Sequence, residues 1–195
     1  PIVLRAELLA EICAAKKTIA IAGTSGKSTT TAMLFHILHV NHLQPSFISG
    51  AGLVYLQKEG KIGNAFGGES DLLLIEADES DGTLVKYKPS IGVLLSIDKD
   101  HKELEELHTI FQTFQKNTKD IFIVNQSHAL AKLFSTNPKN DFGANTLLEG
   151  QNFEQDGFSI SFEVQGIVCK IPTIGKHNME NALACIAVAT KLGLT

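Results

Sequence analysis

The sequence predicts an α/β fold of three layers, in which helices cover both faces of a mostly parallel sheet. Short apolar segments of strand length alternate along the chain with longer segments whose apolar residues recur at helical spacing. The segments 72–75 and 91–95 lack polar residues, which is typical of strands that are covered on both faces. In residues 18–39 a strand, a glycine-rich turn and a helix follow one another, as at the start of a βαβ unit.

Each element is expected from a local pattern, either a short apolar run for a strand or an apolar stripe for a helix. From the N-terminus we expect a helix at 4–15, a strand at 18–22, a helix at 28–39, a strand at 46–48, a hairpin-like excursion over 53–66 with its turn at Gly60, and strands at 72–75 and 91–95. A helix at 104–114, a strand at 121–124, a short helix at 129–134 and a final helix at 178–192 follow.

The segment 153–171 has a different pattern of apolar and polar residues from the rest of the chain. Apolar and polar residues alternate over short stretches, and Asp156-Gly157 and Gln165-Gly166 separate these stretches. This pattern predicts a small antiparallel β segment near the C-terminus, joined to the mostly parallel sheet.

Composition excludes several classes of partner. Apolar residues make up 44% and charged residues 19% of the 195 residues, which is the balance of one ordinary globular domain. The net charge of -4 gives no electrostatic footprint for nucleic acid or a membrane surface, so we expect neither as a partner. The apolar runs are also much shorter than the roughly 20 residues of a membrane span, and no leader sequence is visible.

The cysteines favour a reducing compartment. Cys13, Cys169 and Cys185 are odd in number, and their spacing matches no metal or redox motif, so we expect a cytoplasmic protein. The chain begins at Pro1 and stops shortly after the last helical segment, and we expect it to be a fragment of a longer protein.

The strongest motif is a phosphate-binding loop between the first expected strand and the helix that follows it. Its residues are Gly23-Thr24-Ser25-Gly26-Lys27-Ser28-Thr29-Thr30. Glycines let the backbone fold around phosphate oxygens, and the start of the helix adds its positive end. Lys27 would reach the β- and γ-phosphates, and the Ser28 hydroxyl would join a Mg²⁺ shell. Ile21 stands where the strict motif has its first glycine, and the alternative is a glycine turn with a solvated lysine.

Acidic residues follow the strand at 72–75. Glu76 comes directly after the apolar run. Asp78 would lie on the same face of the strand as Glu76 and could bind a second metal or support the first. Glu79 and Asp81 could cap the next segment. A carboxylate at the carboxyl end of a strand beside a phosphate loop is where the Mg²⁺ of a nucleotide is held, so Glu76 is the first candidate. The alternative is a solvated acidic turn.

Two further segments are weaker candidates. Asp100 and His101 follow the strand at 91–95 and could complete a divalent-metal site, although Asp100 is equally suited to cap a helix. Asn178 and Asn181 lie three residues apart at the start of the last helix, where two amides could read an adenine edge. The competing interpretation is that Asn178 caps the helix and Asn181 is solvated.

These segments, in this order, resemble the Mur ligase family, and within it the branch that joins L-alanine to UDP-N-acetylmuramate. The segments that carry the resemblance are the loop at 23–31, Glu76-Ala77-Asp78-Glu79-Ser80-Asp81, Asp100-His101 and Gly175-Lys176-His177-Asn178 with Asn181-Ala182. The resemblance covers essentially the whole chain. It departs at Ser25, where the family usually has histidine, and after His101, where Lys102-Glu103-Leu104 replaces the usual short apolar and Asp-containing stretch.

The resemblance implies a P-loop-type domain with a specific role. Residues 1–195 would be the central, ATP-binding domain, and the N-terminal UDP-binding and C-terminal amino-acid-binding domains would lie outside this chain. The cofactors would be ATP and Mg²⁺. The loop residues Gly23 to Thr29 would hold phosphates, Ser28 and Glu76 one Mg²⁺, His101 a second Mg²⁺, and His177, Asn178 and Asn181 the adenosine. Lys27, Glu76 and His101 would form the catalytic set.

The implied reaction activates a carboxylate, whose carbon is otherwise a poor electrophile, as an acyl phosphate that an amine then attacks. UDP-N-acetylmuramate would supply the carboxylate and L-alanine the amine. Two alternatives remain open. One is a recycling ligase that adds a ready-made peptide to the same sugar nucleotide. The other is a P-loop ATPase or switch without ligase activity. A guanine-binding switch usually has an Asn-Lys-x-Asp segment, which Asn125-Gln126-Ser127-His128 does not supply.

Overall fold

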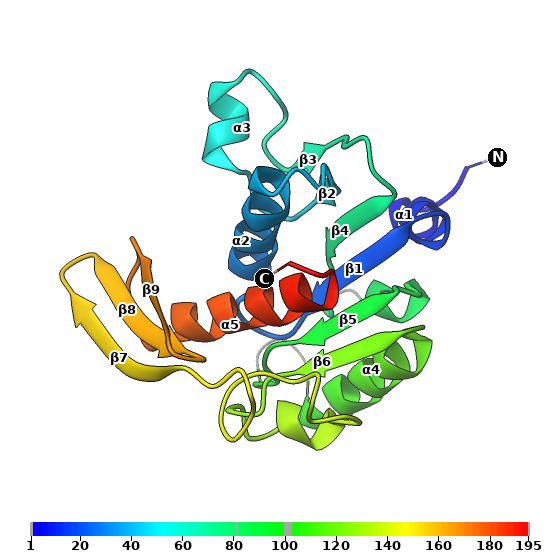
Figure 1. Ribbon diagram of the computed structural model, residues 1–195. Coiled ribbons are helices and arrows are strands. Elements are labelled where there is room, and N and C mark those ends of the chain that lie inside the picture. The colour runs from blue at the N-terminus through cyan, green and yellow to red at the C-terminus, as the bar shows by residue number, and fades with distance from the viewer. Residues whose placement is uncertain (1, 81, 100–102, 195) are drawn as a thin grey trace.

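The computed structural model describes residues 2–80, 82–99 and 103–194, and it contains a large sheet, a small sheet and helices around them (Figure 1). The elements, in chain order, are α1 (Arg5–Ala14), β1 (Lys17–Ala22), α2 (Lys27–Val40), β2 (Ser46–Ile48), α3 (Val54–Lys58), β3 (Ala65–Phe66), β4 (Leu72–Glu76), η1 (Thr83–Lys86), β5 (Ile91–Leu94), α4 (Leu104–Asn117), β6 (Ile121–Val124), η2 (Ala131–Phe134), β7 (Gln151–Asp156), β8 (Ser159–Val164), β9 (Ile167–Ile171) and α5 (Lys176–Lys191).

The large sheet has six strands in the order β3-β2-β4-β1-β5-β6, and all its pairings are parallel except that of β2 with β3. Strand β1 lies between β4 and β5. Ile21 is in register with Glu76 on one side, and Ala22 is in register with Leu94 on the other. The carboxyl ends of these three strands therefore meet at one edge, where the loop after β1 begins.

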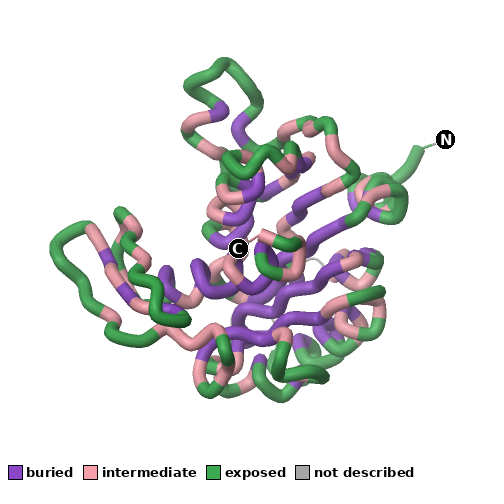
Figure 2. The backbone as a smooth tube through the Cα atoms, in the orientation of Figure 1, coloured by how far each residue is buried: buried purple, intermediate pink, exposed green. Residues whose placement is uncertain are grey.

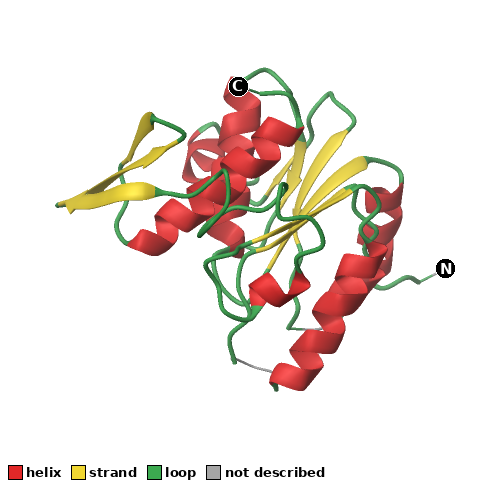
Figure 3. Cartoon of the chain, turned by 60° about the horizontal axis from the view of Figure 1, so that its bottom comes forward, coloured by secondary structure: helices red, strands yellow, loops and turns green. Residues whose placement is uncertain are grey.

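Helices cover both faces of this sheet, which confirms the predicted three-layer α/β fold (Figure 3). Alternate residues of β1 belong to different cores because strand side chains alternate between faces. Ile19 and Ile21 lie in the core that α2 and α5 cover, whereas Ala20 and Ala22 lie in the core that α1 and α4 cover. The inner strands β1, β4 and β5 are accordingly buried over most of their length, whereas the edge strand β3 is not (Figure 2).

The small antiparallel sheet has the order β7-β8-β9 and lies beside α5, as predicted for this segment. Its middle strand alternates: Ile160, Phe162 and Val164 are buried and share a core cluster with residues of α5, while the residues between them are half-buried. The turns fall at the expected glycines, where Gly157 has φ 56° and Gly166 has φ 78°.

The prediction of a hairpin-like excursion over 53–66 is wrong for its first half, because this part of the chain forms the helix α3. Gly60, with φ 75°, is not a hairpin turn but ends this helix. The Lys61 N–H donates to the Leu56 carbonyl at 2.9 Å, and the Gly60 N–H donates to the Gln57 carbonyl at 3.0 Å. This is the hydrogen-bond pattern of a Schellman motif, in which glycine adopts the left-handed conformation after a helix. The second half does contain a strand, since β3 pairs antiparallel with β2.

All three cysteines are free thiols. Cys13 and Cys185 are buried, and burial raises the pKa of the Cys13 thiol to about 11 and that of the Cys185 thiol further. Both thiols therefore stay protonated at neutral pH and act as small apolar side chains in the two cores. Among the helices of the described residues, none has the length and apolar character needed to cross a membrane.

The core that lies under α4 generates a stability prediction. Phe111 is fully buried between α4 and the sheet, so Phe111→Ala should lower the free energy of unfolding by about 3–5 kcal/mol. Phe158 is 85% exposed in the turn between β7 and β8, so the matched control Phe158→Ala should change it by less than about 0.5 kcal/mol. Urea unfolding followed by circular dichroism measures both values. Equal losses in the two variants would contradict this account of the core.

Candidate functional site

The glycine-rich loop leaves the carboxyl end of β1 and enters α2, where the sequence predicts it. Gly23 has φ 138° and Gly26 has φ 85°, both in the region that favours glycine. A Cβ on Gly23 would lie 2.9 Å from the backbone nitrogen of Ser96, and a Cβ on Gly26 would lie 2.6 Å from Oδ1 of Asn181. Glycine is therefore favoured at both positions, because the backbone has a positive φ and because a Cβ would meet Ser96 at position 23 and Asn181 at position 26.

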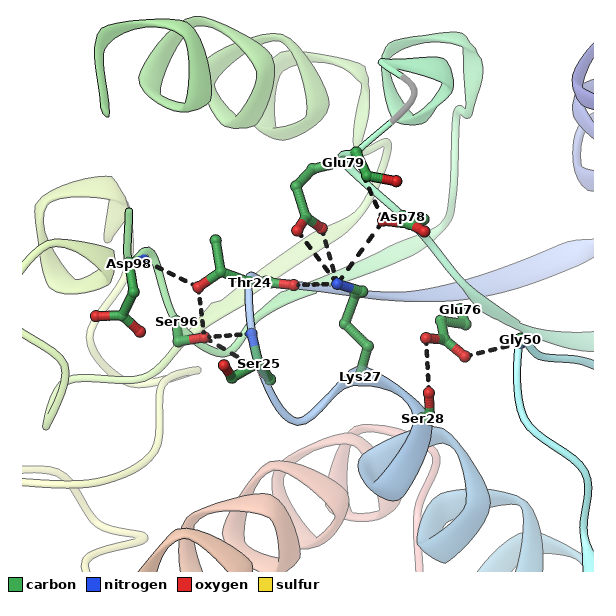
Figure 4. A network of polar contacts seen from close by, with 12 residues as sticks. Thr24, Ser25, Lys27, Ser28, Gly50, Glu76, Asp78, Glu79, Ser96 and Asp98 are labelled. Atoms are coloured by element: carbon green, nitrogen blue, oxygen red, sulfur yellow. Dashed lines mark hydrogen bonds and ion pairs between the residues drawn. The ribbon is translucent and has the colours of Figure 1, made fainter. Parts of the chain in front are cut away.

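Lys27 is the first residue of α2, and its ammonium group lies against the loop and the acidic segment (Figure 4). Nζ donates to the Gly23 carbonyl at 2.8 Å and to the two carboxylate oxygens of Glu79 at 3.0 and 3.2 Å. Asp78 Oδ1 lies 3.8 Å away. The side chains of Lys27 and Glu79 are only 13% and 7% exposed, so each compensates the buried charge of the other.

Glu76 ends β4 and faces the first turn of α2 (Figure 4). Its Oε1 accepts a hydrogen bond from the Ser28 hydroxyl at 2.8 Å. Its Oε2 accepts from the Ser49 hydroxyl at 2.7 Å and from the Gly50 N–H at 2.8 Å. Three donors, one from α2 and two from the segment after β2, thus hold one carboxylate beside the loop, at the position predicted for a metal-binding acid.

Ser96, which follows β5, braces the loop from the other side (Figure 4). Its hydroxyl accepts from the Ser25 N–H at 2.9 Å and lies 3.2 Å from the Thr24 hydroxyl, and its carbonyl accepts from the Thr24 N–H at 3.1 Å. The Thr24 hydroxyl in turn accepts from the Asp98 N–H at 2.9 Å. The loop is therefore held by the segment that follows β5.

Two cavities meet at this loop. The first has a volume of about 230 Å³ and is lined by Thr24, Ser25, Gly26, Lys27, Ser28, Thr29 and Glu76. The second has a volume of about 370 Å³ and is lined by Ser25, Gly26, Leu95, Ser96, Asn125, Phe142, His177, Glu180 and Asn181. Ser25 and Gly26 line both, so the two cavities are neighbours along the loop. We call them the loop cavity and the helix cavity.

The start of α5 forms one wall of the helix cavity. His177 and Asn181 line it, but Asn178 does not. The Asn178 amide nitrogen donates to the Thr173 hydroxyl at 2.9 Å and to the Ile174 carbonyl at 2.8 Å, while Oδ1 accepts from Asn181 at 3.1 Å. Asn178 therefore connects the first turn of α5 to the segment before it. It also holds the side chain of Asn181, which is 6% exposed and not solvated.

The predicted second metal arm, Asp100 and His101, lies outside the described residues. Within the residues that are described, no three His, Cys, Asp or Glu side chains come together as ligands for a metal ion. A metal held at the loop cavity would therefore need ligands from the nucleotide and from water, in addition to Glu76 and Ser28. Mg²⁺ binds nucleotides in this manner, keeping several waters and using few protein ligands.

Several residues of the site were not found by sequence reasoning. The sequence pattern indicates Glu79 only as a cap, and it gives no signal for Ser49, Ser96 or Glu180. Glu79 belonged to a recognisable acidic run, but nothing local distinguishes a carboxylate that pairs with Lys27 from one in solvent. Ser49 and Ser96 each follow a strand next to β4 or β1, and the sheet order needed to see this is a tertiary property.

Comparison with known proteins agrees with this geometry. The family model described as Mur ligase middle domain matches residues 21–189. The chain is 35% identical over 205 residues to the UDP-N-acetylmuramate–L-alanine ligase of Nostoc punctiforme, covering all of this chain and 42% of the relative. The corresponding ligase of Ruthia magnifica is 34% identical and is covered to 44%. The chain thus spans less than half the length of these relatives.

Solved structures give the same fold. The UDP-N-acetylmuramate–alanine ligase MurC of Thermotoga maritima superposes with a TM-score of 0.81 at 24% identity, over 96% of this chain and 44% of that chain. The UDP-N-acetylmuramate:L-alanyl-γ-D-glutamyl-meso-diaminopimelate ligase of Neisseria meningitides gives a TM-score of 0.78 at 25% identity, over 97% of this chain and 66% of that chain. With the family model matched across most of its length, this chain belongs to the Mur ligase family and corresponds to its middle domain.

Proposed function

We propose that residues 1–195 are the central, ATP-binding domain of an ATP-dependent amide ligase of peptidoglycan synthesis. The observation that carries this proposal is the meeting of Lys27, Ser28 and Glu76 at the carboxyl ends of two adjacent parallel strands. A cation, a hydroxyl and a carboxylate around an open glycine-rich loop are the groups that bind a nucleoside triphosphate and its metal. The remaining length of the relatives leaves room for the substrate-binding domains that such a ligase needs.

The loop and Lys27 would bind the phosphates of ATP. The first turn of α2 has unpaired backbone N–H groups at its N-terminus, which favour a negative ligand. Lys27 already lies at this end, where Glu79 and the Gly23 carbonyl hold its ammonium. A phosphate in the loop cavity would compete with Glu79 for Lys27, and the bound lysine would offset charge that develops on the transferred phosphoryl group.

The residues at the loop cavity fit Mg²⁺. Glu76 and Ser28 provide a carboxylate and a hydroxyl that already lie 2.8 Å apart, and oxygen ligands are those that Mg²⁺ prefers. Ser49 and the Gly50 N–H would keep the Glu76 carboxylate oriented by binding its other oxygen. Bound Mg²⁺ would supply charge neutralisation of the phosphates. We retain His101 as the proposed ligand of a second Mg²⁺.

The proposed reaction transfers the γ-phosphoryl group to the carboxylate of UDP-N-acetylmuramate, giving an acyl phosphate and ADP. The amine of L-alanine then attacks the acyl carbon, and phosphate leaves as the amide forms. These substrates are proposed from the names of the relatives, UDP-N-acetylmuramate–L-alanine ligases from several bacteria. They would bind mainly to the domains outside this chain. A nucleotide-dependent reaction and three free thiols both fit the expected cytoplasmic location.

A recycling ligase is the second candidate. Its support is the likeness to the Neisseria ligase, whose name specifies a peptide as the group that is joined to UDP-N-acetylmuramate. Ser25, an exposed loop residue on which the two cavities meet, replaces the histidine usual in the family, and it is consistent with a divergent branch.

Lys27→Ala should lower the affinity of the chain for Mg²⁺-ATP by at least about tenfold, because a charged partner of the phosphates is lost. The matched control is Lys61→Ala, which removes an exposed lysine that contacts Glu59 and the Phe66 ring, away from the loop. Isothermal titration calorimetry measures both affinities. Melting temperatures from the same samples show whether the Glu79 carboxylate left unpaired has unfolded the variant. Equal affinities in two folded variants would contradict the proposed role of Lys27.

Glu76→Gln should raise the Mg²⁺ concentration that gives half-maximal ATP binding by about tenfold, because a neutral amide is a poorer Mg²⁺ ligand than a carboxylate. The change keeps the size of the side chain and an oxygen that can accept from Ser28. Glu69→Gln, an exposed position before the same strand, is the control and should leave the Mg²⁺ dependence unchanged. Titration of Mg²⁺ at fixed ATP tests the prediction, and an unshifted curve for Glu76→Gln would remove Glu76 from the metal site.

The reaction itself is tested on the full-length protein that contains this chain. Phosphate release from Mg²⁺-ATP should require both UDP-N-acetylmuramate and L-alanine, and Lys27→Ala should abolish it. Release only when a tripeptide replaces L-alanine would assign the recycling reaction instead. Release that needs no sugar nucleotide would overturn the ligase proposal and leave an ATPase.

A further inference from the structure

Glu79 occupies the ammonium of Lys27, although the proposed reaction assigns it no part (Figure 4). It lies in the acidic segment after β4 and is 5% exposed. Its two carboxylate oxygens accept from the Lys27 Nζ at 3.0 and 3.2 Å, and the Gly23 carbonyl accepts from the same Nζ at 2.8 Å. These three acceptor atoms match the three N–H donors of the ammonium, which leaves none for a phosphate.

Of the two partners of Lys27, Glu79 is the one that can leave. The Gly23 carbonyl belongs to the same peptide group as the Thr24 N–H, and this N–H donates to the Ser96 carbonyl at 3.1 Å, so the peptide group is fixed. Glu79 instead reaches Lys27 with a side chain that can rotate about its own bonds. A phosphate that binds Lys27 therefore has to displace the Glu79 carboxylate.

The charges around the loop cavity act in the same direction. Asp78 Oδ1 lies 3.8 Å from the Lys27 Nζ, and Glu76 lines the cavity together with Lys27. With Glu79, three carboxylates thus lie near one ammonium. An anion that enters without a metal ion meets repulsion from these carboxylates as well as competition for the lysine. An experiment on Glu79 has to separate these two effects.

We propose that Glu79 is an internal competitor for Lys27, a specificity-determining residue that keeps weakly bound anions out of the loop. This inference rests on the proposed function, since it assumes that phosphates bind at the loop. Every anion that takes Lys27 displaces the same carboxylate, so each is weakened by the same factor. Mg²⁺-ATP offsets this loss through the N–H groups of the loop and through its metal, whereas a single phosphate has fewer contacts to offset it.

The competition also bears on how the proposed reaction ends. Phosphate is released when the amide forms, and the site has to be cleared before the next ATP binds. Once the polyphosphate is gone, the Glu79 carboxylate would return to the Lys27 ammonium that it holds in this structure. A single phosphate would then have no ammonium at the loop, so it would be released rather than retained.

A purely structural role of Glu79 makes the opposite prediction. If Glu79 only held Lys27 in position for the phosphates, its removal would loosen the lysine and weaken every phosphate ligand. If Glu79 competes for Lys27, its removal strengthens binding. Glu79→Gln decides between these roles, because it keeps the size of the side chain while a neutral amide binds an ammonium less strongly than a carboxylate does.

The test measures three ligands by isothermal titration calorimetry: inorganic phosphate and pyrophosphate in EDTA, where no metal contributes, and Mg²⁺-ATP. It compares the wild-type chain with Glu79→Gln and two control variants. Asp78→Asn removes a carboxylate that is 56% exposed and near Nζ, but not hydrogen-bonded to it at 3.8 Å. Glu59→Gln removes the carboxylate of an exposed ion pair with Lys61, away from the loop. Melting temperatures show which samples are folded.

Glu79→Gln should bind pyrophosphate and Mg²⁺-ATP each about tenfold more tightly than the wild type, by the same factor because the same carboxylate is displaced. Inorganic phosphate should bind Glu79→Gln more tightly by this factor too. Asp78→Asn should strengthen binding by less than about threefold, since it reduces the repulsion and leaves the competitor in place. Glu59→Gln should match the wild type.

Unchanged or weaker binding of the three ligands by folded Glu79→Gln would overturn the competition and leave the proposed function intact. Equal strengthening by Asp78→Asn and Glu79→Gln would also overturn it, because the effect would then come from the net charge of the acidic segment. Failure of all four proteins to bind Mg²⁺-ATP, in folded samples, would instead contradict nucleotide binding itself and would take the role of Glu79 with it.

Discussion

The parallel pairing of β1 with both β4 and β5 is the constraint on which the site depends. Parallel strands end at the same edge of a sheet, so three chain segments that are remote in sequence deliver their next residues to one place. The loop after β1, Glu76 at the end of β4 and Ser96 after β5 meet there because of this pairing alone. A change of strand order would leave each segment locally intact and separate the groups that form the site.

Close packing around the loop is the second condition. A Cβ at position 23 would meet the Ser96 backbone, and a Cβ at position 26, where φ is 85°, would meet the side chains of Asn181 and Leu95. Helix α5 also contacts α2 directly, since the buried thiol of Cys185 lies 3.4 Å from the Thr30 carbonyl that it donates to. The last helix of the chain therefore supports the first loop, and the site is complete only when both ends of the chain have folded together.

The charged side chains around the loop are all paired or hydrogen-bonded within the protein. Lys27 and Glu79 are both nearly buried, and each would be costly without the other. The Glu76 carboxylate similarly accepts three hydrogen bonds, from Ser28, Ser49 and Gly50. Such contacts hold the side chains in place before a ligand arrives, which reduces the ordering that binding requires. In the proposed nucleotide complex, phosphate would replace Glu79 at Lys27, so one anion would take the place of another.

The sequence alone determined most of the fold and the most conspicuous part of the site. Hydrophobic spacing is a local property, so the helices, the strands and the small antiparallel sheet could be predicted, and the glycine-rich loop could be recognised with Lys27, Ser28 and Glu76. The prediction for residues 53–60 was wrong, because a five-residue helix ending in glycine and a hairpin have similar local patterns.

Only the tertiary structure decided which polar residues join these groups. Four contacts connect residues whose partners no local pattern specifies. They are the pairing of Lys27 with Glu79, the hydrogen bonds of Ser96 to the loop, the hydrogen bonds of Asn178 to the segment before α5, and the contact of Asn125 with Glu180. Side-chain hydrogen bonds of this kind depend on distances between elements, and these distances are set by the order of the strands and by the packing of α5 against the sheet.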